Sequence, residues 1–402
     1  NLKKKTEEVE ATFGQQFVLP TIPPAGLWNN LSDEREKIID LKIQSESMIE
    51  KFENLFSKKV NSKYAISLNS CTSALHLSCL ALGIKKGDCV WTSPNSFVAS
   101  SNCAIYCGAK IDFIDIDLIT YNICIETLEK KLSDAKKLNK LPKLLVSVHF
   151  AGLLNYQKKI HALSKKYGFK ILEDACHALG SKNDTEVAGS CKFSDITVFS
   201  FHALKAITTG EGGMATTNNK QLFEKLATLR THGITRNPKK LSINKYNKLH
   251  YEQQSLGYNN RITDIQAALG ISQLKKLDQF IKKRKNIAKE YDKKLTNLPL
   301  VLNKRISNYH SAFHLYVVRT KNKKIKTELI NYLFKNKIFV SFHYIPIYHH
   351  PFYKKMGFKK GYCPNMEKYY DTAISLPIYP GLKQNDQKIV CKYLNLFFNE
   401  KK

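Results

Sequence analysis

The sequence SDITVFSFHALKAITTGEGGMATT, residues 194–217, carries the clearest indication of the fold. Its β-branched and aromatic residues predict a strand, and the segment from Met214 to Thr217 predicts another after the glycines. A single lysine, Lys205, lies in the loop between them, flanked by hydroxyl residues and glycines. A lysine held between two strands and partly shielded from water is a candidate Schiff-base nucleophile, because shielding favours its neutral amine.

An acidic residue upstream strengthens this reading of Lys205. Residues 170–175, KILEDA, predict a buried strand that ends at Asp174. The chain has 64 Lys and Arg residues, so most lysines are surface charges, and Lys205 stands out through its setting. Pyridoxal phosphate enzymes need such a pair, because the lysine bonds the cofactor and the carboxylate keeps the ring nitrogen protonated. The sequence therefore predicts pyridoxal 5′-phosphate as cofactor, with Lys205 and Asp174 as catalytic residues.

Strand and helix patterns alternate along the first two thirds of the chain. This alternation predicts the α/β class, with a mostly parallel sheet covered by helices on both faces. Ligands gather beyond the carboxyl ends of such strands, which is where Asp174 is expected. The expected strands are 64–68, 90–92, 110–116, 143–148 and 170–173, followed in the C-terminal part by 313–318 and 339–344.

Four stretches resemble, in chain order, signature stretches of the DegT/DnrJ/EryC/StrS family of sugar aminotransferases. They are LNSCTSALHL, ILEDACHALG, FSFHALKAITTGEGG and GYNNRITDIQAALG. Longer stretches, among them 91–117 and 343–353, are similar to one branch, the UDP-4-amino-4,6-dideoxy-N-acetyl-β-L-altrosamine transaminases of pseudaminic acid synthesis. The resemblance implies PLP-dependent transferase fold type I, the aspartate aminotransferase architecture. Its expected parts are an N-terminal segment and helix (1–60), a large PLP-binding domain (61–277) and a small C-terminal α+β domain (278–402).

Ser70, Cys71 and Thr72 precede an apolar helix, and such a start suits a phosphate, because free N–H groups and the helix dipole attract anions. From the residues alone, an ordinary Ser/Thr N-cap is the alternative. The resemblance implies that Cys71 and Thr72 donate to the cofactor phosphate, with Ser70 beside them. Cys71 replaces the Gly or Ala that the family usually has.

The resemblance also implies further cofactor contacts. Phe97 would stack on the cofactor ring, although a core phenylalanine is the alternative. His177 would order the acid or the ring, and the Ser200 hydroxyl would bind the phosphate. Asn259 would reach across a homodimer interface to the partner's phosphate, although an Asn N-cap is the alternative, and each active site would be shared.

Substrate contacts are expected at both ends of the chain. The family's Leu-Thr-x-Gly-Pro pattern is missing near the N-terminus, and the nearest candidates there are Trp28 and Asn29. In HYIPIYHHPFY, His343 and Tyr344 resemble sugar-nucleotide contacts. The histidines of this stretch lack metal-ligand spacing, so no metal is expected.

The formal net charge is +30, but the basic runs are scattered and no nucleic-acid-binding motif is present. We therefore expect no nucleic acid as partner. No apolar run is long enough for a membrane, and the ten cysteines form no disulfide pattern, so the sequence predicts a cytoplasmic protein without a membrane partner. A PLP-fold regulatory or nucleic-acid-binding protein is the alternative from another class, and salt-resistant DNA binding in a gel shift would favour it.

The expected reaction transfers an amino group from glutamate to C4 of a UDP-linked 4-keto-6-deoxy-N-acetylhexosamine, in nonulosonic acid or related surface-glycan synthesis. Perosamine- and 3-amino-sugar enzymes of the same family are the nearer alternatives. Dehydratase members carry histidine in place of the lysine, and Lys205 argues against that branch.

Overall fold

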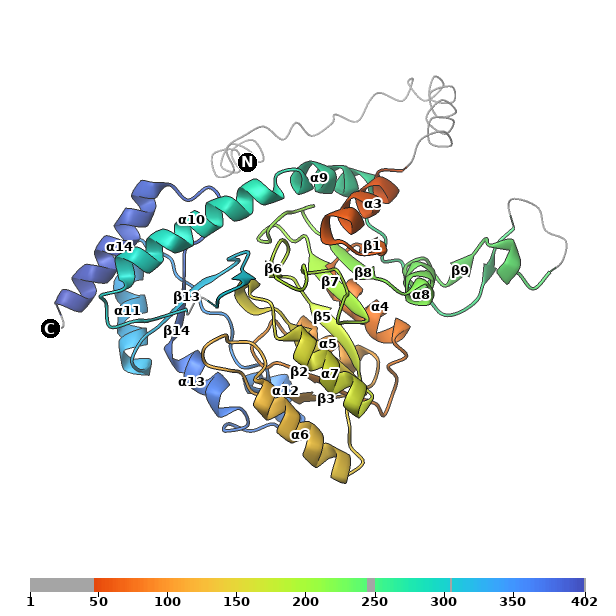
Figure 1. The fold of residues 1–402 in the computed structure, drawn as a ribbon, viewed down its shortest axis with the longest axis horizontal. Coiled ribbons are helices and arrows are strands. Elements are labelled where there is room, and N and C mark those ends of the chain that lie inside the picture. Colours follow the sequence, from red (N-terminus) through yellow and green to blue (C-terminus); the bar gives the residue numbers. More distant parts are fainter. Residues whose placement is uncertain (1–46, 244–249, 304–305, 401–402) are drawn as a thin grey trace, which may run out of the picture. The chain divides into compact units, whose positions relative to one another are not determined.

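The computed structural model describes residues 47–243, 250–303 and 306–400 (Figure 1). Contacts along the chain divide it into two units, Asn1–Ser47 and Met48–Lys402, and the fold described here belongs to the second. The expected substrate contacts Trp28 and Asn29 lie outside the described residues.

Seven strands form one sheet, in the order β1 (Tyr64–Leu68), β8 (Gly213–Thr217), β7 (Ile196–Ser200), β5 (Lys170–Asp174), β4 (Leu144–Val148), β2 (Cys89–Thr92) and β3 (Lys110–Phe113). Neighbours from β7 to β3 run parallel, and β8 runs antiparallel to both β7 and β1. The carboxyl ends of β4, β5 and β7 therefore meet at one edge.

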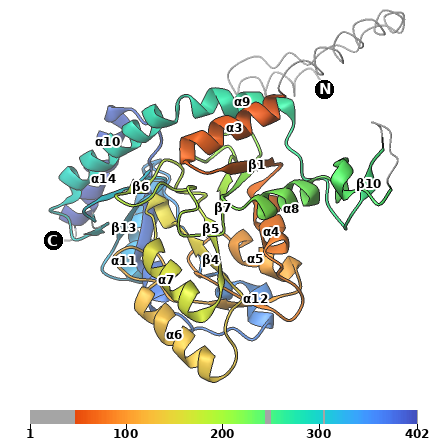
Figure 2. The same ribbon diagram turned by 45° about the vertical axis from the view of Figure 1, so that its right-hand side comes forward.

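Helices cover both faces of this sheet, because alternate strand residues point to opposite sides. Leu144 and Val146 pack in the core with α4 (Cys71–Ala81), α5 (Ala99–Tyr106) and α8 (Lys220–Arg230). Leu145, between them, packs with α6 (Ile125–Lys137) and α7 (Gln157–Tyr167), which lie side by side in Figure 2. The same face carries α3 (Met48–Val60) and α9 (Asp264–Leu274) near β7 and β8.

A smaller antiparallel sheet follows, in the order β11 (Val301–Leu302), β13 (Tyr316–Arg319) and β14 (Ala373–Leu376). Its core packs against α10 (Leu277–Leu295), α11 (Lys323–Lys335) and α14 (Gln384–Asn399). The expected α/β class and fold type I are confirmed, whereas the expected domain boundaries stay a prediction. The remaining elements are β6 (Lys182–Asn183), β9 (Ile234–Thr235), β10 (Glu252–Gln253), β12 (Tyr309–His310), η2 (Phe150–Gly152), η3 (Pro238–Lys240), η4 (Ile347–His349), α12 (Pro351–Lys355) and α13 (Pro364–Thr372).

The strand expected over 339–344 is wrong. Only Ser341 makes a bridge, to Ser375 on the edge of β14. The chain then leaves that edge, and His343 and Tyr344 turn toward a cavity instead of continuing a ladder. No helix among the described residues combines the length and the apolar character that crossing a bilayer requires.

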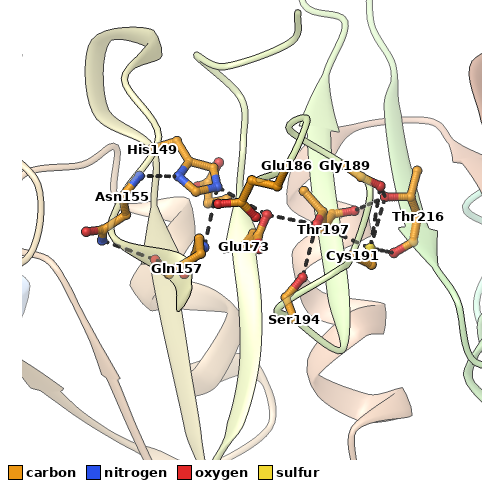
Figure 3. Close-up of polar contacts among 12 residues, drawn as sticks. His149, Asn155, Gln157, Glu173, Glu186, Gly189, Cys191, Ser194, Thr197 and Thr216 are labelled. Atoms are coloured by element: carbon orange, nitrogen blue, oxygen red, sulfur yellow. Dashed lines mark hydrogen bonds and ion pairs between the residues drawn. The ribbon is translucent and has the colours of Figure 1, made fainter. Parts of the chain in front are cut away.

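A buried polar network lies on the face of β5 opposite to Asp174 (Figure 3). Glu173 Oε2 accepts a hydrogen bond from Thr197 Oγ1 at 3.0 Å and lies 3.1 Å from His149 Nε2. Glu186, with 9% of its surface exposed, lies in the same network. Burial, and then the charge of Glu173, raise the pKa of Glu186 to about 7, against the opposing charges of His149 and Lys192.

We expect this carboxyl to make stability depend on pH. The pKa of Glu186 is raised in the folded chain. The contribution of this carboxyl to the free energy of unfolding is therefore fully present below pH 4.5 and is lost as pH rises through 7. The Glu186→Gln variant should therefore be more stable than the wild type at pH 8, by up to roughly 3 kcal/mol, and similar at pH 5. Thermal unfolding at both pH values measures the difference. Glu224→Gln, which changes an exposed carboxyl on α8, should show no such pH-dependent gain.

Candidate active site

A cavity of about 760 Å³ opens where β4, β5 and β7 end. Val148, Asp174 and Ser200, the last residues of these strands, line it together with residues near the small sheet. Ten of the thirteen residues predicted for the site meet here: Ser70, Cys71, Thr72, Phe97, Asp174, His177, Ser200, Lys205, His343 and Tyr344. Their individual roles stay predictions.

Asp174 offers the cavity a buried carboxylate, of which only 6% is exposed. Ser100 Oγ donates to its Oδ2 at 2.6 Å, and the backbone N–H of Cys176 donates to its Oδ1 at 3.1 Å. Ser96 Oγ lies 2.7 Å from Ser100 Oγ and extends the chain of hydroxyls. These bonds hold the carboxylate in one orientation. No lysine or arginine among the described residues forms an ion pair with Asp174, so it can serve a cationic group in the cavity.

Lys205 lies half-buried in the loop between β7 and β8. The loop is fastened on both sides of the lysine, because Lys205 N donates to His202 O at 2.9 Å and Thr209 N donates to Phe201 O at 3.0 Å. The side chain of Lys205 lines the same cavity as Asp174. The Lys205 amine and the buried Asp174 carboxylate thus line one cavity, and their catalytic roles stay predictions.

The first turn of α4 and the end of β7 form a cradle for an anion. Ser70 caps the helix, with its Oγ accepting from Ser73 N at 3.1 Å. The first N–H groups of a helix have no partner inside the helix, so those of Cys71 and Thr72 are available to a phosphate. Ser200, opposite Gly213 in the strand register, adds a hydroxyl to the same wall.

Gly213 permits this close approach of strand and helix. A Cβ at this position would lie 2.5 Å from Ser70 C and O and 2.6 Å from Cys71 N, which are backbone atoms that cannot easily move aside. We expect Gly213→Ala to displace the helix start and to weaken cofactor binding at least tenfold, measured by absorbance titration. Gly381→Ala is the matched control, because its Cβ would meet only the Tyr379 ring at 3.7 Å. Unchanged affinity in Gly213→Ala would show that this turn is not the phosphate site.

His177 connects the cofactor wall to the expected substrate segment. The backbone N–H of Ala151 donates to its Nδ1 at 3.3 Å, so the proton of the neutral ring is on Nε2. That Nε2 lies 3.1 Å from Tyr344 Oη and can donate to it, which leaves the Tyr344 hydroxyl proton for a ligand. Burial, followed by the charges of His314 and Lys205, lowers the pKa of His177 well below its usual value and keeps the ring neutral.

Among the predicted residues that the structure describes, Asn259 is the one that is not part of this wall. Asn259 is exposed, pairs with Thr231 in a bridge and does not line the cavity of its own chain. Its expected reach across a dimer interface stays a prediction. Phe97 does line the cavity and is 61% exposed, so its ring can still cover a ligand.

Sequence reasoning missed several cavity residues. Ser100 holds Asp174, yet it is one of several serines in a helical stretch. His314 stacks on His177 with ring centroids 4.2 Å apart. Arg284, 5% exposed, donates from Nη1 to three backbone carbonyls, and its sequence context is a surface-like run of lysines. No sequence signal distinguishes these residues, because their neighbours are brought together only by folding.

The model of the DegT/DnrJ/EryC1/StrS aminotransferase family matches residues 36–395. The chain belongs to this family. Its members and relatives are pyridoxal-phosphate-dependent, and the chain is a PLP-dependent sugar aminotransferase.

Several relatives within the family are similar to this chain over most of its length. The chain is 38% identical over 346 residues to the UDP-4-amino-4,6-dideoxy-N-acetyl-beta-L-altrosamine transaminase of Campylobacter jejuni, covering 85% of this chain and 87% of the relative. It is 31% identical to the GDP-perosamine synthase of Escherichia coli O157:H7, covering 88% and 91%. The structure of Helicobacter pylori PseC, an aminotransferase involved in the biosynthesis of pseudoaminic acid, superposes with a TM-score of 0.80 at 30% identity, covering 91% and 96%.

The residues of the cavity fit pyridoxal phosphate. The buried carboxylate of Asp174 suits a protonated ring nitrogen, and Lys205 suits the aldehyde. The start of α4 suits the phosphate, and it can lie close to β8 because Gly213 has no side chain. One cavity therefore offers a partner to each polar end of the cofactor.

Proposed function

We propose that the chain transfers an amino group from glutamate to C4 of a UDP-linked 4-keto-6-deoxy-N-acetylhexosamine, in nonulosonic acid or related surface-glycan synthesis. The observation that carries the proposal is the single cavity that joins Lys205 and Asp174 to the His343–Tyr344 segment. The similarity to the Campylobacter jejuni transaminase supports a UDP-linked substrate.

Pyridoxal phosphate, when bound, supplies an electron sink for the carbon that loses its proton. Asp174 holds positive charge at the ring nitrogen, and Ser100 keeps the carboxylate turned toward the cavity. The Lys205 amine takes the proton from the α-carbon of the donor and later gives one to the sugar carbon. Both transfers use the same Nζ, so one lysine serves both halves of the reaction.

We infer that His343 and Tyr344 bind the sugar nucleotide, because both line the cavity that holds Lys205 and Asp174. His343 Nδ1 lies 2.9 Å from Ser375 Oγ, and Tyr369 Oη donates to the His343 carbonyl at 2.8 Å. Burial, and then the charge of Lys205, lower the pKa of His343 to about 4, so its ring is neutral at physiological pH. A neutral imidazole and a phenol favour the hydroxyl and amide groups of a sugar over a second anion.

A comparison of three keto-sugars tests the substrate. The loaded enzyme receives glutamate with a UDP-linked 4-keto-6-deoxy-N-acetylhexosamine, GDP-4-keto-6-deoxymannose or a nucleotide-linked 3-keto-sugar, and amine product is followed by mass. We expect kcat/KM for the UDP-linked sugar to exceed that for the others at least tenfold, because site contacts that a substrate leaves unpaired are costly. A preference for the GDP-linked sugar would instead support the perosamine type of activity.

A further inference from the structure

Two cysteines from distant segments touch in the cofactor wall. Cys71 is the first residue of α4, and Cys176 follows the end of β5 by two residues. Their sulfur atoms lie 3.1 Å apart, and both residues line the 760 Å³ cavity. Cys71 is 8% exposed and Cys176 is partly exposed, so the pair can be reached through the cavity.

We propose that Cys71 and Cys176 are a modification site at which a peroxide forms a disulfide in the cofactor-free chain. A disulfide bond is about 2.05 Å long, so the two sulfur atoms need to approach by only about 1 Å. Both are free thiols in the structure, as are the other eight cysteines. Because the pair is separated by 105 positions in sequence, the bond would fasten the start of α4 to the end of β5.

The chemistry needs one peroxide for each disulfide. The Cys71 sulfur attacks a peroxide oxygen, the O–O bond breaks, and a sulfenic acid and one water form. The Cys176 sulfur then attacks the Cys71 sulfur, the S–O bond breaks, and a second water leaves with the thiol proton. The two sulfurs together lose two electrons, and hydrogen peroxide is reduced to two waters.

The order of the steps follows from the positions of the two thiols. Cys71 is the first residue of α4 and lines the cavity through which a peroxide would enter. The contact with Cys71 and burial raise the pKa of Cys176 well above its usual value, so Cys176 stays protonated. Cys71 is therefore the sulfur that reacts with the peroxide, and Cys176 is the one that resolves the sulfenic acid.

The bond would oppose cofactor binding. The N–H of Cys71 is an expected phosphate donor, and the N–H of Cys176 holds Asp174 Oδ1 at 3.1 Å. A disulfide would therefore constrain both segments that contact the cofactor, at its phosphate and at its ring. Bound cofactor would in turn cover the thiols and keep the peroxide from reaching them. We expect a saturating cofactor to slow disulfide formation at least tenfold.

Peptide mapping tests the site without relying on activity. The full chain, with and without pyridoxal phosphate, is treated with stoichiometric hydrogen peroxide, blocked with a thiol reagent and digested with trypsin. We expect a cross-link between the peptides 64–85 and 171–182, lighter by two hydrogens, which forms rapidly only without cofactor and disappears on reduction. Fragmentation distinguishes Cys71 from Cys79, which lies in the same peptide.

Variants complete the test. Cys176→Ser should lose the cross-link, whereas Cys391→Ser, a change at a buried thiol on α14, should keep it. If Cys176→Ser does not unfold cooperatively, Cys176→Ala replaces it. If the Cys71–Cys176 cross-link forms at the same rate with saturating cofactor as without it, the claim that the disulfide opposes cofactor binding is wrong. Oxidation confined to other cysteines would overturn the site itself, and neither result depends on which amino sugar the enzyme makes.

Discussion

Replacing Lys205 by alanine should abolish turnover, with a loss of at least about 10⁴-fold. The side chain is expected both to bond the cofactor and to move the proton in each half-reaction, so its removal takes away nucleophile and base together. The fold should persist, because Lys205 is half-buried in a loop whose own fastening uses backbone atoms. Steady-state product formation, with thermal unfolding as the check of the fold, measures both effects.

The matched control for this change is Lys220→Ala. Lys220 is an exposed lysine at the start of α8 and is absent from the cavity wall. The Lys220→Ala variant should have cofactor absorbance and turnover close to those of the wild type. Turnover by Lys205→Ala within tenfold of the wild type would assign the nucleophile to another residue.

Replacing Asp174 by asparagine should lower turnover by about 10²- to 10⁴-fold. The amide keeps the size of the carboxylate and can still accept from Ser100, but it carries no charge to hold the ring nitrogen protonated. Leaving a buried charge without its partner costs about 3–5 kcal/mol, which corresponds to this loss of rate if it applies at the transition state. The covalent link to Lys205 should still form. This variant should therefore keep its cofactor content while its turnover falls.

Ser100→Ala provides the graded comparison for Asp174→Asn. It removes one hydrogen bond to the carboxylate, at 2.6 Å, and leaves the charge in place. Because a hydrogen bond to a charged group contributes about 1.5–3 kcal/mol, the loss of turnover should be smaller than that of Asp174→Asn. Asp174→Asn activity within threefold of the wild type would contradict the proposed role of the charge.

The central sheet could be predicted from sequence because its strands are short and mostly apolar and buried. All residues of β4 are buried, and parallel strands of this kind stand out between amphipathic helices. The segment 339–344 has a similar composition, but its neighbours decide its conformation. It pairs with β14 at a single position, and such edge contacts depend on tertiary structure that a local pattern does not contain.

The site could be predicted where chemistry restricts the residue type. Three features occur together in the sequence: a loop lysine, an acid at the end of a strand and a hydroxyl-rich helix start. Few kinds of site other than a pyridoxal phosphate site combine them, and in the structure all three line one cavity. Ser100 and His314 were missed because they act through Asp174 and His177, which approach them only in the fold. The contact between Cys71 and Cys176 was missed for the same reason.

The most direct test of the central claim is an absorbance spectrum of the chain loaded with pyridoxal phosphate, taken before and after glutamate is added. We expect a visible band that is absent in Lys205→Ala and that bleaches with glutamate in the wild type. We also expect an accepted keto-sugar to restore the band. A chain that shows no band at saturating cofactor, or one whose band glutamate leaves unchanged, would contradict the claim that this cavity performs the first half of a transamination.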